Sequence, residues 1–186
     1  EEVAAKGGET GARARIEQAG IHASRGNPAE ANLILDRVAS AEVDSDLRAA
    51  AMMEKGKNFY AMGEADKANY LEAVRVWKQI AQPSAFAPAW RNQALCRIGS
   101  ALEKTGDPDG AVAAYYDVFK PSGEPLPEFF WFHKAGFAAA RILESQGRWE
   151  EAIRVYKIMA DAEGPRSLEA RNRIRKIRLE NFLWEP

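Results

Sequence analysis

Apolar residues recur at helical spacing on both sides of a tight turn at residues 106–108. Gly106 suits the left-handed residue that ends a helix, Asp107 can cap the next helix, and Pro108 fits its first position. The stretch 94–119 therefore predicts two amphipathic antiparallel helices, which need further helices as neighbours to bury their apolar faces. The positions that define these faces are Leu95, Ile98, Gly99 and Leu102 before the turn, and Ala111, Val112, Tyr115, Val118 and Phe119 after it.

Variants of this pattern lie on either side of it. At Gly26 the next helix has Asn27 as its expected cap, with Glu30 placed to complete a capping box. Ser167 is placed to cap a last helix, and the proline-rich stretch 120–127 predicts a loop. The pattern predicts a lead-in at residues 1–10 and one helical domain at 11–186, with repeats at about 12–40, 46–82, 87–120 and 127–163 and an end helix at 165–184.

Small and bulky residues recur in step with the turns. A small residue early in each second helix is followed four places later by a bulky one. A small side chain lets two helices approach closely, and a bulky one fills the space beside it. The turn glycines are Gly26, Gly63, Gly106 and Gly147; the small residues are Ala31, Ala73, Ala111 and Ala152; the bulky ones are Leu35, Trp77, Tyr115 and Tyr156.

The first helices carry a further small residue seven places before each turn glycine: Ala19, Gly56, Gly99 and Ala140. With Trp149 two places after Gly147, this arrangement resembles the tetratricopeptide repeat. The resemblance covers residues 12–162 and leaves 163–186 as a solvating end helix. It implies an all-α, right-handed superhelical solenoid of about four helix–turn–helix repeats plus a C-terminal helix.

The repeats also depart from the family pattern. They run to roughly 38–42 residues rather than about 34, and Leu95 and Gly136 stand where the family has an aromatic residue. Longer helices or loops are expected, as in the divergent repeats of bacterial envelope-assembly and Tol–Pal-type coordinator proteins.

The composition of the chain argues against several classes of function. The net charge of −1 gives no global field for nucleic acid or anionic membrane, and no apolar run approaches the ~20 residues of a membrane span. The single cysteine excludes an internal disulfide. Because the chain starts at Glu1 rather than Met, we expect a processed product or a piece of a longer protein, and both a periplasmic or envelope location and a cytoplasmic one stay open.

Residues with catalytic or ligand chemistry form no motif. His22 and His133 are far apart in sequence, and Cys96 has no basic neighbour, so ordinary helix residues and an inert thiol are expected. Carboxylate pairs such as Glu150-Glu151 are expected to cap helices or to lie on solvent-exposed helix faces. No glycine-rich phosphate loop is present. The sequence thus predicts no catalytic, metal or cofactor site, and a protein that is not an enzyme.

The largest run of charge lies at the last helix and consists of Arg166, Arg171, Arg173, Arg175, Lys176 and Arg178. Arg171, Arg175 and Arg178 share one helical face, while the opposite face is apolar. We interpret these arginines as the solvent-exposed face of an end helix rather than as a binding site for an acidic or nucleic-acid ligand, because no aromatic residues are interleaved for base stacking.

The resemblance implies that the first helices line a concave groove for a peptide or protein segment. Family register places these partner-binding residues in it: Met53, Lys57, Tyr60, Gln93, Glu103, Lys134, Phe137 and Arg141. It also places Arg13, Ile16, Cys96, Ser100 and Glu144 there. The chaperone-tail-binding subfamily has a carboxylate clamp whose position reads Gly20, Lys57, Ser100 and Arg141 here, without asparagine, which argues against that activity.

The aromatic run Phe129, Phe130, Trp131 and Phe132 is a second candidate surface. Four consecutive helical residues cannot all face one core. Packing against the helix at 108–119 is expected for part of the run, with a partner or dimer contact as the alternative.

The function predicted from these features is a non-catalytic scaffold or adaptor that binds a protein or peptide, not nucleic acid or membrane. Two alternatives remain: a structural or homo-oligomerisation module of a larger assembly, and a regulatory domain of a larger enzyme.

Overall fold

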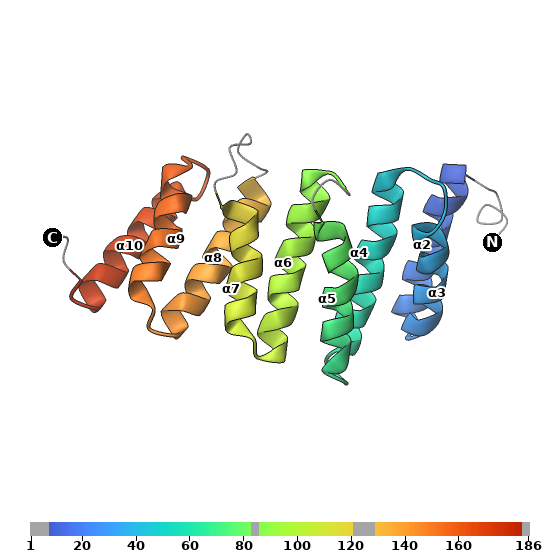
Figure 1. Cartoon of the computed structure of the whole chain (residues 1–186), viewed down its shortest axis with the longest axis horizontal. Helices are drawn as coiled ribbons and strands as arrows, with labels where there is room; N and C mark the ends of the chain where they lie inside the picture. Colours follow the sequence, from blue (N-terminus) through green and yellow to red (C-terminus); the bar gives the residue numbers. More distant parts are fainter. Residues whose placement is uncertain (1–7, 83–85, 121–128, 184–186) are drawn as a thin grey trace. The chain divides into compact units, whose positions relative to one another are not determined.

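The computed structural model describes residues 8–82, 86–120 and 129–183, and within these ranges the chain forms nine helices and no strand (Figure 1). The all-α prediction is confirmed for this part of the chain. The helices are α2 (Gly8–Ser24), α3 (Pro28–Ala39), α4 (Ser45–Met62), α5 (Ala68–Ala81), α6 (Pro88–Thr105), α7 (Pro108–Phe119), α8 (Phe129–Ser145), α9 (Trp149–Asp161) and α10 (Ser167–Glu180).

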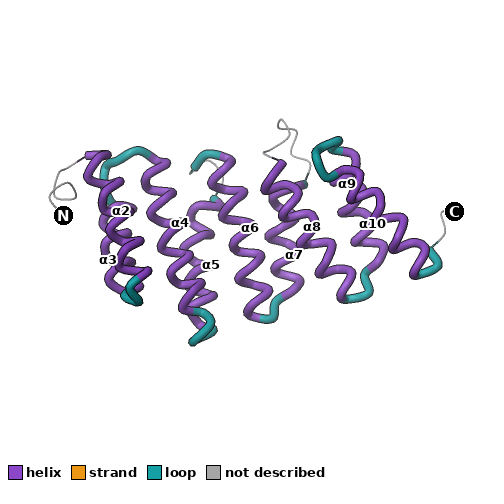
Figure 2. The backbone as a smooth tube through the Cα atoms, turned by 180° about the vertical axis from the view of Figure 1, so that it is seen from behind, coloured by secondary structure: helices purple, strands orange, loops and turns teal. Residues whose placement is uncertain are grey.

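The helices fall into two compact units, residues 1–106 and 107–186. In the first, each helix from α2 to α6 packs against the next, and α4 also touches α2 and α6 (Figure 2). Alternate helices therefore lie beside one another, as helix–turn–helix repeats require. In the second unit α7, α8, α9 and α10 pack in the same consecutive order. Whether residues 11–186 form one domain with the repeat boundaries given above stays a prediction.

The core of the first unit contains a close contact between a small and a bulky residue that the repeat alignment names separately. Trp77 on α5 is fully buried and lies directly against Gly56 on α4. A Cβ atom at Gly56 would come within 2.1 Å of the indole Nε1. That indole N–H donates to the Met53 carbonyl at 3.3 Å. Only glycine therefore lets these two helices approach to this distance.

In the second unit, α8 and α9 also approach closely where a glycine faces a large side chain. Gly136 faces Met159, whose sulfur would lie 2.2 Å from an added Cβ. Ala140, Ala152 and Tyr156 are buried as the repeat alignment predicts. Gly136, a departure from the family pattern, makes room for a large side chain of the next helix.

Three of the four predicted turn glycines adopt the left-handed conformation: Gly26, Gly106 and Gly147, with φ of 81°, 81° and 70°. Gly63 instead has a φ of −61° and is required for space, because an added Cβ would lie 2.5 Å from the Tyr70 ring. The Asp107 carboxylate accepts the Gly110 backbone N–H at 2.9 Å, and Pro108 begins α7, both as predicted.

Some local predictions are wrong in whole or in part. Asn27 stands at the N-cap of α3 as predicted, but its side chain makes no capping bond. Arg166 rather than Ser167 occupies the cap position of α10. The first described helix, α2, begins at Gly8, before the start of the first repeat expected at about residue 12. The loop predicted at 120–127 lies, beyond Lys120, outside the described residues. None of the described helices has both the length and the apolar character needed to cross a membrane.

Candidate functional site

Two of the residues expected in the groove are buried instead. Met53 on α4 and Cys96 on α6 are each 1% exposed and belong to the core of the first unit. Ile16 is also partly buried against the core formed by α2, α3 and α4, whereas Arg13 is exposed. A partner cannot reach Met53 or Cys96 in this fold, so the expectation that they line a groove is wrong.

Tyr60 and Lys57 on α4 are half-buried by neighbours of their own unit. The Tyr60 ring packs edge-on against Tyr70, with centroids 5.1 Å apart. The Lys57 Nζ lies 2.6 Å from a Glu54 oxygen. On α6, which touches α4, the half-buried residues include Gln93, Ser100 and Glu103. These residues carry charges of both signs, and the Lys57 ammonium is already paired within α4.

One face of α8 carries a different arrangement, which we call the α8 face: Phe130, Lys134, Phe137 and Arg141. Its members are spaced by four, three and four residues, so they form a stripe along one side of the helix. The Phe130 side chain is 64% exposed, and Lys134 and Arg141 are exposed. The Lys134 Nζ lies 5.8 Å from the Phe130 ring centroid and 5.3 Å from that of Trp131. The cation therefore sits within reach of two aromatic rings.

Arg166, just before α10, extends this face. Its guanidinium carbon lies 3.7 Å from the Phe137 centroid, and its nitrogens donate to both Glu169 oxygens at 2.7 Å. The carboxylate fixes the guanidinium over the ring, and its bonds raise the pKa of Arg166. Sequence reasoning places Arg166 only in a basic run, because nothing in the periodicity links it to Phe137.

Glu144, near the C-terminal end of α8, is held by two partners. It accepts the Tyr156 hydroxyl at 2.7 Å and an Arg173 nitrogen at 2.9 Å. Burial and this carboxylate raise the pKa of Tyr156 to about 12. Part of the basic run on α10 is thus structural: Arg173 fastens α10 to α8, and Lys176 lies 3.7 Å from Glu180.

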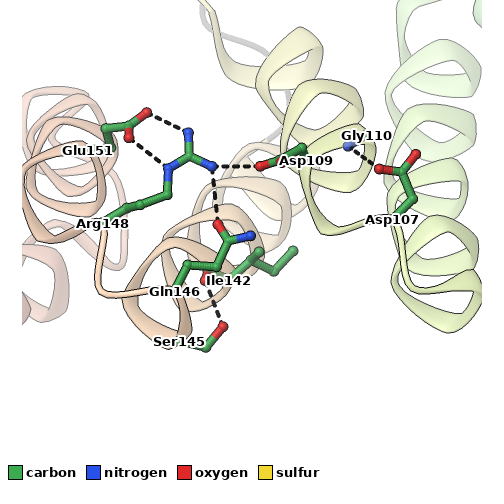
Figure 3. A network of polar contacts seen from close by, with 8 residues as sticks. All are labelled: Asp107, Asp109, Gly110, Ile142, Ser145, Gln146, Arg148 and Glu151. Carbon is green, nitrogen blue, oxygen red and sulfur yellow. Dashed lines mark hydrogen bonds and ion pairs between the residues drawn. The ribbon is translucent and has the colours of Figure 1, made fainter.

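Arg148 organises a second polar network, shown in Figure 3. Its guanidinium donates to both Glu151 oxygens at 2.7 Å and reaches Asp109 on α7 at 2.6 Å. It also bonds Gln146 at 3.1 Å. These hydrogen bonds hold the pKa of Glu151 below its ordinary value. The network joins the α8–α9 turn to the start of α7, which gives these carboxylates a structural role.

The aromatic run divides as its spacing requires. Phe132 is buried, Phe130 is exposed, and Phe129 and Trp131 are half-buried. Phe129 lies against Gly164, where an added Cβ would come within 2.5 Å of its ring. Phe130 and Trp131 therefore remain as candidate contacts, while Phe129 is engaged in packing.

The residues with catalytic potential are dispersed. His22 lies in the first unit and His133 in the second, where its ring stacks on Phe129. In the described part of the chain no three His, Cys, Asp or Glu side chains are grouped so that they could hold a metal ion.

Comparison with known proteins identifies the fold. Residues 137–168 match the family model "Tetratricopeptide repeat". A search of curated proteins finds no match. Two crystal structures of nearly identical TPR-like repeats, from a Podosopora anserina protein described as a kinesin light chain, have similar folds. One of the two carries a single-residue substitution.

Both structures superpose with a TM-score of 0.61 and 19% sequence identity over 91% of this chain, covering 85% of the substituted chain and 86% of the other. At this identity the likeness concerns the fold. The matched repeat begins at Phe137 and contains the end of α8 and all of α9. Residues 137–168 thus match a tetratricopeptide repeat, and the fold of the chain is similar to that of TPR-like helical-repeat structures.

Proposed function

We propose that the chain is a non-catalytic protein-binding scaffold and that the α8 face, together with Trp131 and Arg166, holds a segment of a partner protein. Folds of this type generally serve as protein-interaction scaffolds. The observation that carries the proposal is the exposure of Phe130, 64%, beside a cation held over aromatic rings. Aromatic residues and arginines dominate binding hot spots, which makes this stripe the strongest candidate in the described chain.

The charges of this region indicate what the segment would carry. Glu169 is bonded to Arg166 and Glu144 to Arg173, whereas the Lys134 ammonium lies against aromatic rings. A segment with one apolar side chain for the Phe130 and Phe137 rings and a carboxylate for Lys134 fits this pattern. Lys57, Tyr60, Gln93 and Glu103 form a second contact region in the proposal, and Met53 is excluded from it because it is buried.

A random peptide library displayed on phage, selected against the full chain, tests this proposal. The selected peptide is then mapped by amide chemical-shift changes in labelled protein. We expect the largest changes along residues 130–141 and at Arg166. Changes confined to α3, α5, α7 and α9 would overturn the assignment of the α8 face. A selection that enriches no binding peptide would contradict the scaffold proposal itself.

A second candidate function is self-association, favoured by three exposed apolar residues at the C-terminal helix. Leu168, Leu179 and Phe182 are 67%, 60% and 77% exposed. The two leucines lie eleven residues apart on α10, about three helical turns, and therefore on one side of it. Light scattering over a wide range of protein concentration tests this candidate. A molar mass that rises with concentration in the wild type, but stays at the monomer value in the double variant Leu168→Lys/Leu179→Lys, supports it. A constant monomer mass removes it.

A further inference from the structure

His133 is enclosed by aromatic rings in the second unit. Its side chain is 4% exposed and stacks on Phe129, with centroids 5.5 Å apart and an interplanar angle of 17°. The rings of Phe132 and Phe137 approach it edge-on, at 5.5 Å and 6.4 Å. Its Nε2 atom is buried and has no hydrogen-bond partner among the described residues. A proton added there would find no acceptor, which makes the charged form costly in this position.

The corner between α9 and α10, residues 162–166, lies directly on this ring pair. A Cβ atom on Gly164 would come within 2.8 Å of the His133 Cε1 atom and 2.5 Å of the Phe129 ring. The preceding residue, Glu163, has a φ of 52°, in the left-handed region that non-glycine residues rarely adopt. The corner is therefore held in a strained conformation by its packing against α8.

The same corner positions Arg166, the residue that extends the proposed partner-binding face. Only one residue separates Gly164 from Arg166, whose guanidinium lies 3.7 Å from the Phe137 centroid. Movement of the corner away from His133 would therefore draw the guanidinium off the ring.

The charges around His133 reinforce the cost of protonation. Burial lowers the pKa of His133 first and the positive charge of Arg166 lowers it further, while Glu169 opposes them. Glu169 is itself bonded to Arg166 at 2.7 Å. The helices packed against α8, which are α7 and α9, add no further charge acting on the ring among the described residues.

We infer that His133 is a pH-sensitive latch: the neutral ring keeps the corner at residues 162–166 closed, and protonation opens it and withdraws Arg166 from Phe137. The inference rests on the proposed function only in its consequence, since opening would remove one contact from the partner-binding face. The latch itself is a property of the free chain.

Nuclear magnetic resonance of the full chain without any partner tests the latch. The variant His22→Gln leaves His133 as the one histidine signal. As the pH is lowered from about 7.5, past the ordinary histidine pKa of about 6.5, until the His133 signal has titrated, we expect the Arg166 side-chain signals to lose their ring-current shift in step with it. Over the same range, amide-exchange protection at residues 162–170, corrected for intrinsic rates, should fall about tenfold or more relative to α7.

The matched variant His133→Phe keeps an aromatic ring that cannot take a proton, and in it the corner should stay closed over the same range. If His133 titrates in the His22→Gln chain while Arg166 and the corner amides do not change, the latch is refuted, and this arm does not depend on the folding of His133→Phe. An equal loss of protection in His133→Phe would also refute it. Either failure leaves peptide binding at neutral pH, and so the proposed function, untouched.

Discussion

The indole of Trp77 lies against the backbone of Gly56, and its N–H donates to the carbonyl of Met53 three residues earlier on the same helix as the glycine. Two positions that the repeat alignment treats separately, a small residue on the first helix and a bulky one on the second, thus form one contact. This contact sets how closely α4 and α5 approach.

Replacing Gly56 by alanine should therefore destabilise the chain. The added Cβ would lie 2.1 Å from the Trp77 ring, so the indole must move and lose its hydrogen bond. We expect a loss of about 1–3 kcal/mol in the free energy of unfolding, measured by urea denaturation. Gly20→Ala is the control: nothing lies within 4 Å of an added Cβ there, and an exposed helical glycine should gain about 0.5–1 kcal/mol on substitution. Equal effects at both positions would contradict the close-approach argument.

Removing the Tyr156 hydroxyl should weaken the attachment of α10 to α8. Tyr156→Phe loses the bond to Glu144, at a cost of about 1 kcal/mol, while Glu144 keeps its pairing with Arg173. Tyr116→Phe, on an exposed residue of α7, controls for the loss of a hydroxyl. A larger effect from Tyr116→Phe would be inconsistent with this account.

The burial of the Tyr156 hydroxyl and its bond to Glu144 also predict that the free energy of unfolding depends on pH in the alkaline range. Because the pKa of Tyr156 is about 12 in the folded chain, against about 10 in the unfolded chain, its contribution is complete below about pH 10. It is lost as the pH rises through about 12. Unfolding free energies measured across this window should fall less steeply in Tyr156→Phe than in the wild type, and parallel curves would argue against the raised pKa.

The contribution of the Arg148 network to stability should depend on pH and on salt concentration. Since the pKa of Glu151 is lowered in the folded chain, its pairing with Arg148 stabilises above the unfolded pKa of Glu151 and is lost as the pH falls through the folded one. The pairs are exposed, so we expect Arg148→Gln to have a small effect that shrinks in high salt. Melting temperatures of the wild type and of Arg148→Gln at low and high salt measure this effect. A difference between the two chains that grows with salt would contradict the prediction.

The parts of this fold that sequence can predict are those set by local rules. Gly106 and Asp107 are readable because a helix end and a helix start require particular backbone and side-chain groups. The positions of Gly56 and Trp77 are each readable, because Gly56 lies seven residues before its turn glycine and Trp77 lies four residues after a small residue, as in the other repeats. These signals concern how helices stack.

The candidate site is less predictable. Met53, expected in the groove, is buried because it lies where α5 packs on α4, next to the Trp77 indole that donates to its carbonyl. The contact between Arg166 and Phe137 joins residues of different helical segments, and its geometry depends on the corner at residues 162–166. Asn27 has the residue type of a cap, but its backbone leaves the side chain without a capping bond.

The central claim, that the α8 face binds a protein segment, is tested most directly by the affinity of a phage-selected peptide for matched variants. Phe130→Ala/Lys134→Ala removes two exposed side chains of the face, and Leu71→Ala/Lys78→Ala removes an equivalent exposed pair from α5. Both double variants should unfold within about 1 kcal/mol of the wild type. We expect the α8 variant to bind the peptide about tenfold or more weakly and the α5 variant to bind as the wild type does. Equal affinity of the peptide for the α8 variant and the wild type would contradict the claim.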